Sequence, residues 1–155
     1  MKKVSIFCDG GCRGNPGIGG YGTILQFVND AGEVIEKEIS GCKYQTTNNQ
    51  MELTAVIKGL QALKERCEVT ITTDSQYVVN AFNKCWLDSW VKNNWKTASR
   101  QPVKNEELWK ELLFLVNLHQ CSFVWVKGHN GHPENERCDA LANKEMDNLE
   151  ERNNA

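Results

Sequence analysis

The sequence predicts an α/β domain in which a mixed, five-stranded sheet carries helices on both faces. Segments with the two-residue alternation of strands and segments with the 3.6-residue period of helices follow one another in the order strand, strand, strand, helix, strand, helices, strand, helix. Short connections between the first three strands favour an antiparallel meander. The later strands are entered through helices, which favours parallel pairing by right-handed crossovers. The length of 155 residues fits one compact domain.

The N-terminal part supplies the three strands of the meander. Residues 3–8 alternate as in a strand, with Val4, Ile6 and Cys8 on one face and Ser5 and Phe7 on the other. The glycine-rich stretch 10–17 is predicted to be a loop. Residues 21–28 and 33–40 are predicted to be two further strands. The turn residues 29–32 join them as a hairpin.

A long amphipathic helix is predicted to begin at Asn48 or Asn49. The apolar residues that fall on one face at helical spacing are Leu53, Val56, Ile57, Leu60, Leu63 and Cys67. A short β-branched strand over 69–73 follows. Ser75 is the expected N-cap of the next helix, because its hydroxyl can accept a hydrogen bond from a free backbone N–H.

Three more elements complete the order. They are a helix over about 105–119, a strand over 121–126, and a last helix that Pro133 opens and that runs through Met146. The polar tail 147–155 is expected to fray. One domain over residues 1–146 is therefore expected.

The composition excludes several classes of protein. With 40% hydrophobic and 25% charged residues the chain is typical of globular proteins, and its apolar runs are far shorter than the roughly 20 residues needed to span a membrane. Asp9 interrupts the first apolar run too early for a signal peptide. Seven cysteines without a CxxC pair indicate reduced thiols, so a cytoplasmic location is expected. A net charge of -2 argues against a generally basic nucleic-acid binder and confines any such binding to a local patch.

Four acidic residues stand where apolar segments end or begin. Asp9 and Asp74 follow two strands predicted to be parallel, Glu52 opens the first helix, and Asp139 lies beyond a loop rich in glycine and histidine. Because the carboxyl ends of parallel strands meet at one edge of a sheet, Asp9 and Asp74 are expected side by side. Converging carboxylates repel one another unless a cation lies between them. A cluster that holds Mg²⁺ or Mn²⁺ is typical of phosphoryl transfer or hydrolysis.

Three of these acids also have a structural interpretation. Glu52 completes a capping-box pattern that begins at Asn49. Asp74 could be a solvated turn residue. Asp139 is one of three acids at a helix start, where acids are favoured, and the residues alone do not choose between it and the other two, Glu134 and Glu136.

Four motifs occur together and in order along the chain. They are Cys-Asp-Gly-Gly-Cys with Gly-Asn-Pro-Gly behind it, Thr-Thr-Asn-Asn-Gln-Met-Glu-Leu, Thr-Asp-Ser-Gln-Tyr-Val, and Trp-Val-Lys-Gly-His-Asn-Gly-His-Pro-Glu-Asn-Glu-Arg-Cys-Asp. With the Trp-rich insert between the last two, the chain from about Val4 to Met146 resembles bacterial type 1 ribonuclease H. The resemblance implies a ribonuclease H-like fold with three antiparallel and two parallel strands. It also implies endonucleolytic hydrolysis of the RNA strand of RNA–DNA hybrids by a two-Mg²⁺ mechanism, with Mn²⁺ as a possible substitute, leaving 5′-phosphate and 3′-hydroxyl ends. A monomer without an obligate protein partner is expected.

The resemblance assigns roles to individual residues. It gives metal binding and catalysis to Asp9, Glu52, Asp74 and Asp139, and so selects Asp139 over its acidic neighbours. It gives His129 a mobile supporting role in proton transfer or product release. Contacts to the hybrid near the cut are implied for Gly10, Cys12, Asn15, Thr47, Asn48, Asn49 and Gln76.

The insert at about 84–104 corresponds to a protruding handle that grips the DNA strand in the family. Basic residues interleaved with aromatic ones can follow a phosphate backbone and stack on sugars or bases. The candidate substrate contacts here are Trp86, Trp90, Lys92, Trp95, Lys96 and Lys104. The alternative is that the tryptophans pack helices together and the lysines form a solvated face.

The handle is less basic than the handles of the most basic relatives. This departure is expected to affect the affinity for the hybrid and not the hydrolysis itself. Places where relatives often carry lysine or arginine are occupied by Val91, Asn93, Asn94 and Gln101. Gln45 likewise lacks a positive charge that some relatives have near a phosphate pocket. Each lost phosphate contact should lower affinity and flatten its salt dependence.

The sequence allows three other interpretations. A non-catalytic hybrid-binding module of the same fold is disfavoured by the retained acids. A nuclease of the same fold that resolves DNA junctions or integrates DNA is disfavoured by the Trp-rich insert and the Gly-His-Asn-Gly-His loop. A zinc-binding structural protein would use Cys138 with His129 and His132, at a spacing that matches no common zinc module. His132 is instead expected to hold the turn before Pro133.

Overall fold

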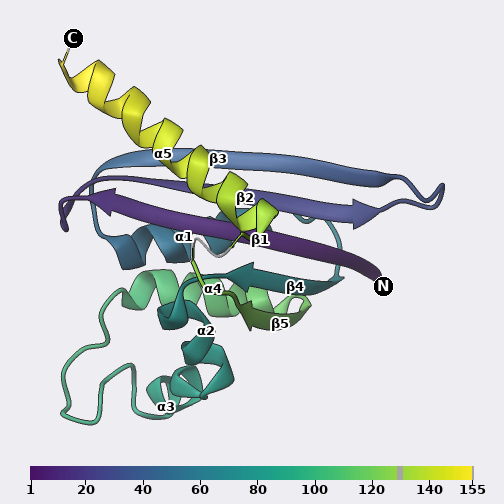
Figure 1. The fold of residues 1–155 in the computed structure, drawn as a ribbon. Coiled ribbons are helices and arrows are strands. Elements are labelled where there is room, and N and C mark those ends of the chain that lie inside the picture. Colours follow the sequence, from purple (N-terminus) through teal and green to yellow (C-terminus); the bar gives the residue numbers. More distant parts are fainter. Residues whose placement is uncertain (129–130, 155) are drawn as a thin grey trace.

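The computed structural model describes residues 1–128 and 131–154 of the chain. Five strands form one sheet in the spatial order β3-β2-β1-β4-β5 (Figure 1). They are β1 (Lys2–Arg13), β2 (Gly17–Val28), β3 (Val34–Thr46), β4 (Cys67–Thr73) and β5 (Gln120–Trp125). β1, β2 and β3 pair antiparallel, whereas β4 pairs parallel to both β1 and β5. The predicted mixed sheet is confirmed.

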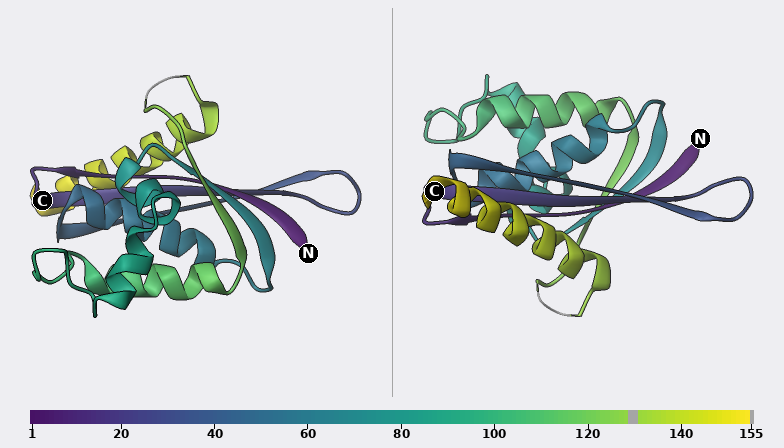
Figure 2. Two further views of the ribbon diagram at one scale, coloured as in Figure 1. Left: turned by 90° about the horizontal axis from the view of Figure 1, so that it is seen from below. Right: turned by 90° about the horizontal axis from the view of Figure 1, so that it is seen from above.

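Helices cover both faces of the sheet. They are α1 (Asn48–Gln61), α2 (Gln76–Asn83), α3 (Trp86–Lys92), α4 (Glu106–Asn117) and α5 (Pro133–Asn154). α5 crosses β1, β2 and β3 on one face, while α1 packs on the opposite face with α4 against its outer side (Figure 2). In the part of the chain that the structure describes, none of the helices combines the length and the apolar character that crossing a membrane requires.

The main core lies between the sheet and α1. The three β1 residues predicted to share a face, Val4, Ile6 and Cys8, are buried there. The predicted apolar face of α1 is also buried as far as Leu60, but the prediction was wrong for Leu63 and Cys67. α1 ends before Leu63, and Cys67 begins β4. Periodicity alone does not separate the end of a helix from the start of a strand that faces the same core.

The glycine-rich stretch is a second correction. β1 continues through Arg13 and pairs with β2, with Gly11 opposite Gly20 and Cys12 opposite Gly19. Only residues 14–16 form the turn of this long hairpin. Gly14 does lie in this turn, whereas Gly10 lies in β1, where it lets the backbone of α1 approach the sheet.

The C-terminal tail is a third correction. Residues 147–154 are not frayed but form the last two turns of α5. Leu149 is only 2% exposed, and Arg13 of β1 forms ion pairs with Asp147 at 2.7 Å and Glu150 at 3.0 Å. One buried leucine and a shared arginine therefore anchor a segment whose composition looks purely polar.

Candidate active site

The four acids singled out by the sequence line one pocket of about 300 Å³. They come from four different elements: Asp9 from β1, Glu52 from α1, Asp74 from the residue after β4, and Asp139 from α5. β1 and β4 are in parallel register with Cys8 opposite Thr73, so the acids that follow these residues lie side by side, as predicted. Of the three acids at the start of α5, only Asp139 lines the pocket.

Two glycines allow the helices to carry their acids to the sheet. A Cβ on Gly10 would overlap the backbone of Met51, one residue before Glu52. A Cβ on Gly22 would overlap the carbonyl oxygen of Cys138, one residue before Asp139 of α5. Any side chain at these two positions would push α1 or α5 away from the sheet. The glycine pattern of the hairpin therefore builds the pocket.

Burial and mutual repulsion perturb two of the carboxyl groups. Burial raises the pKa of Asp9 to about 8, and the charge of Asp74, a hydrogen bond shared with Asp139 and the charge of Glu52 add to the rise. Burial also raises the pKa of Glu52 to about 7, with a further rise from Asp74, while the hydrogen bond from Ser75 opposes it. A bound cation would relieve this repulsion and favour the ionised forms.

Glu52 does not serve as a helix cap. The N-cap of α1 is Thr47, whose Oγ1 accepts a hydrogen bond from the Gln50 N–H at 3.3 Å, so a capping box beginning at Asn49 is wrong. Ser75 is confirmed as the N-cap of α2 and also donates its hydroxyl proton to Glu52 Oε2 at 2.5 Å. One serine therefore both starts α2 and orients a carboxylate of the pocket.

The donor set fits a hard, hydrated cation. Carboxylate oxygens are the ligands that Mg²⁺ prefers, and Mg²⁺ retains several waters instead of requiring a complete protein cage. Over residues 1–128 and 131–154, no three His, Cys, Asp or Glu side chains already form a ready-made metal cage.

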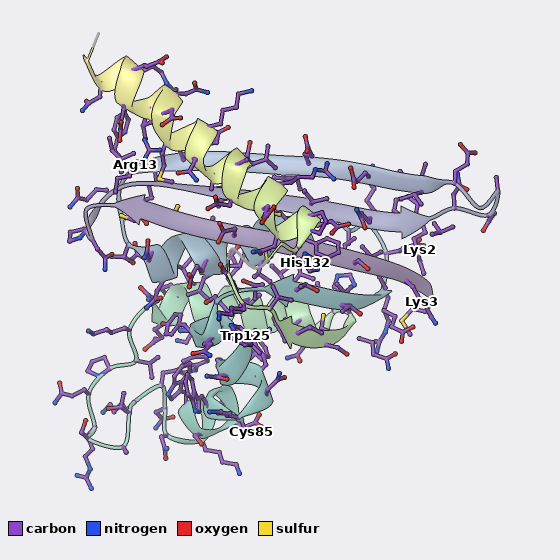
Figure 3. The ribbon with its side chains drawn as sticks, viewed as in Figure 1. Lys2, Lys3, Arg13, Cys85, Trp125 and His132 are labelled. Atoms are coloured by element: carbon purple, nitrogen blue, oxygen red, sulfur yellow. The ribbon has the colours of Figure 1, made fainter. Side chains whose placement is uncertain are left out.

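The zinc interpretation finds no support. Burial raises the pKa of the Cys138 thiol to about 12, which disfavours the thiolate that zinc requires. His132 Nδ1 accepts a hydrogen bond from the Asn135 N–H at 3.3 Å, so His132 holds the start of α5, as expected (Figure 3). His129 lies outside the described residues, so its assigned role stays a prediction.

The residues implied to contact a hybrid near the cut surround the acids. Gly10, Cys12 and Asn48 line the same pocket, and the Asn48 N–H donates to Asn15 Oδ1 at 3.2 Å. Thr47 adjoins them as the cap of α1. A shallower pocket beside the first also contains Glu52 and Asp74, and two implied contacts line it, Asn49 and Gln76.

The handle projects from the body of the protein beyond α2 and α4 (Figure 1). Its α3 leads into a loop that one isolated β-bridge, between Lys96 and Pro102, closes. The Trp90 ring lies 5.4 Å from the buried Trp109 and 6.3 Å from Trp95, so these two handle tryptophans pack helices together. The other four candidate contacts of the handle are exposed to solvent. They are Trp86, Lys92, Lys96 and Lys104. Substrate contact by any of these residues stays a prediction.

Sequence reasoning missed two residues that support the acids. Trp125 Nε1 donates to the backbone oxygen of Asp74 at 3.0 Å and so fixes the segment after β4 (Figure 3). Arg13 lines the pocket and binds α5. Trp125 is the first residue of the Trp-Val-Lys-Gly-His motif, so the sequence could have indicated its role. Arg13 carried none, because its partners lie in the segment expected to fray.

A carboxylate cluster at the carboxyl edge of parallel strands is the ligand set of metal-dependent phosphoryl-transfer and hydrolysis enzymes. Comparison with known proteins narrows this class. The family model described as RNase H matches residues 1–147. A ribonuclease H of Hydrogenovibrio crunogenus is 55% identical over 96% of this chain and 99% of its own length. A ribonuclease HI of Neisseria meningitidis serogroup B is 57% identical over 92% of this chain and 94% of its own. The chain belongs to the ribonuclease H family, whose enzymes are in general metal-dependent.

Solved structures agree on the fold. The crystal structure of LC9-RNase H1, a type 1 RNase H with the type 2 active-site motif, superimposes with a TM-score of 0.86 at 31% identity, covering 96% of this chain and 74% of that one. LC11-RNase H1 superimposes with a TM-score of 0.68 at 24% identity, covering 94% of this chain and 98% of that one; this likeness carries the fold alone.

Proposed function

We propose that this chain hydrolyses the RNA strand of RNA–DNA hybrids endonucleolytically, with Mg²⁺ as cofactor, and leaves 5′-phosphate and 3′-hydroxyl ends. The observation that carries the proposal is the convergence of four carboxylates, from four elements, in one pocket of a ribonuclease H-family chain. LC11-RNase H1, which shares the fold, was solved in complex with an RNA/DNA hybrid. The hybrid is accordingly the first substrate to test.

Asp9, Glu52, Asp74 and Asp139 are the residues that would hold the metal. Bound in pairs, divalent cations activate water and neutralise the charge that develops on the phosphate. The chain itself supplies the arrangement of ligands. Ser75 fixes one oxygen of Glu52 with its hydroxyl proton, and β1 and β4 hold Asp9 and Asp74 side by side.

Amides and hydroxyls beside the acids would grip the sugar and phosphate of the strand to be cut. The turn of the β1–β2 hairpin and the start of α1 are joined by the hydrogen bond from the Asn48 N–H to Asn15 Oδ1, so they present one continuous polar surface. Discrimination of RNA from DNA requires contact with the 2′-hydroxyl, which both donates and accepts hydrogen bonds. Gln76 and Asn49 line the second pocket, which also contains Glu52, and are the candidates to extend this surface.

The handle would bind the DNA strand through its exposed lysines. The chain carries a net charge of -2, so any attraction for a duplex must come from a local patch, and the described handle has no acid from Lys92 to Lys104. We further propose one domain that includes the handle, a monomeric state and a cytoplasmic location. Sedimentation of the purified chain would test the monomer.

Measuring cleavage and binding of a hybrid separately distinguishes this function from that of a non-catalytic hybrid-binding module. A labelled hybrid is incubated with the purified chain in EDTA and then in Mg²⁺, and the products are resolved with their ends identified. The proposal expects binding alone in EDTA and internal cuts with 5′-phosphate ends in Mg²⁺. Binding without cuts in Mg²⁺ or Mn²⁺ would instead identify a binding module.

A further inference from the structure

Among the described residues that line the acidic pocket, Arg13 is the only basic one. Its guanidinium is already occupied by α5 (Figure 3). Nη1 lies 2.7 Å from Asp147 Oδ1 and 3.0 Å from Glu150 Oε1, and Nη2 donates to Asn143 Oδ1 at 3.3 Å. Three side chains over two turns of α5 therefore hold the end of β1.

These contacts continue to the backbone of the residue that carries a proposed metal ligand, Asp139. Asn143 uses its other amide atom, because Nδ2 donates to the backbone oxygen of Asp139 at 3.0 Å. Arg13 and Asn143 both line the pocket, together with Asp9 from the same strand as Arg13. The arginine thus links the strand that carries Asp9 to the helix that carries Asp139.

We propose that Arg13 is a positioning residue: by binding Asp147 and Glu150 in the last turns of α5, it sets the separation of Asp139 from Asp9 and so the affinity of the site for divalent cations. The inference rests on the proposed function. A role as a phosphate ligand fits the contacts less well, since one guanidinium between two carboxylates is a cluster of net negative charge that would repel a phosphate.

The sign of one effect separates positioning from simple electrostatics. Arg13→Ala removes a positive charge near the acids, and Coulomb's law alone would then tighten cation binding. Positioning requires the opposite, a weaker site. Groups that hydrogen-bond a ligating side chain typically change metal affinity by about 10- to 100-fold. Because Arg13 acts on Asp139 only through Asn143 and the backbone of α5, we expect a smaller loss, of about 3- to 10-fold. Arg13→Lys keeps the charge and should recover most of the affinity.

A second variant removes the partners instead of the arginine. Asp147→Asn with Glu150→Gln should also weaken cation binding, but it removes two negative charges and so needs a charge-matched control. Glu33→Gln with Glu151→Gln removes the same charge at two exposed side chains and leaves both Arg13 and the contacts of α5 with the sheet unchanged.

The experiment titrates each folded variant with Mn²⁺ alone, by calorimetry, and then measures kcat and KM for a hybrid at saturating metal. We expect Arg13→Ala and the Asp147/Glu150 variant to bind Mn²⁺ more weakly than their controls, with KM for the hybrid within about twofold of the parent chain. Unchanged or tighter Mn²⁺ binding by Arg13→Ala would overturn the inference. So would a rise in KM at unchanged Mn²⁺ affinity, which would identify a phosphate ligand. A parent chain that binds no Mn²⁺ would overturn the proposed function itself.

Discussion

Asp9→Asn should stabilise the metal-free protein at alkaline pH while abolishing cleavage. The carboxyl group of Asp9 is partly buried beside three other acids, and its pKa is raised to about 8, above the ordinary value of 3.8. Ionised Asp9 is therefore unfavourable in the folded protein unless a cation is bound. Asparagine keeps the shape of the side chain and removes the charge.

The direction of the pH effect follows from linkage. Because the pKa is higher in the folded state, the folded protein holds a proton that the unfolded chain has released. The contribution of the Asp9 carboxyl group to the stability of the fold is therefore complete below about pH 4 and is lost as the pH rises to about 8. One pKa unit corresponds to about 1.36 kcal/mol, so the wild-type chain should lose up to about 4 kcal/mol between about pH 5 and about pH 8 through Asp9. Because the neighbouring acids share this titration, we expect the variant to gain about 2–4 kcal/mol relative to wild type over this interval.

Urea denaturation in EDTA at the two pH values measures the gain as a difference in the free energy of unfolding. Asp30→Asn, in the exposed β2–β3 turn, is the matched control and should give the same small difference at both pH values. Added Mg²⁺ should then stabilise wild type more than Asp9→Asn, because the ion binds the intact cluster. An advantage of Asp9→Asn that does not grow with pH would refute the reasoning.

Three further variants test separate parts of the site. Ser75→Ala removes the hydrogen bond that lowers the pKa of Glu52, so the pH profile of cleavage should shift upward, with about 1 kcal/mol lost from the capped α2; an unmoved profile would exclude a role for the hydroxyl in catalysis. His129→Ala should slow turnover with Mn²⁺ binding retained, and a wild-type rate would remove His129 from the mechanism. Alanine at three handle lysines should raise KM most strongly at low salt and flatten its salt dependence, whereas an unchanged KM would make the handle structural. These three lysines are Lys92, Lys96 and Lys104.

The sequence was sufficient for the architecture because two local rules settle it. Short connections join antiparallel strands, and helical connections join parallel ones, so the order of elements predicts the sheet. The same rules placed Asp9 beside Asp74, and the register of Cys8 with Thr73 confirms it. How close Glu52 and Asp139 come could not be predicted, since it depends on helix–sheet contacts at two glycines.

The errors share a physical cause. The glycines of the β1–β2 hairpin are turn formers by local preference, but contact with helices distant in sequence holds them in strands. The last turns of α5 are polar in composition and are ordered through Leu149 and the distant Arg13. Local patterns do not contain such partners. The error over the tail also concealed Arg13, the residue that the structure connects to the proposed metal site.

The most direct test of the central claim is a comparison of cleavage rates on four substrates of the same sequence: RNA–DNA hybrid, double-stranded RNA, single-stranded RNA and DNA, each with Mg²⁺ and with EDTA. The account predicts Mg²⁺-dependent cleavage of the RNA strand of the hybrid and little cleavage of the other three. It also predicts that Asp9→Asn abolishes this activity. Equal cleavage of the hybrid in EDTA, or a preference for DNA or double-stranded RNA, would contradict it.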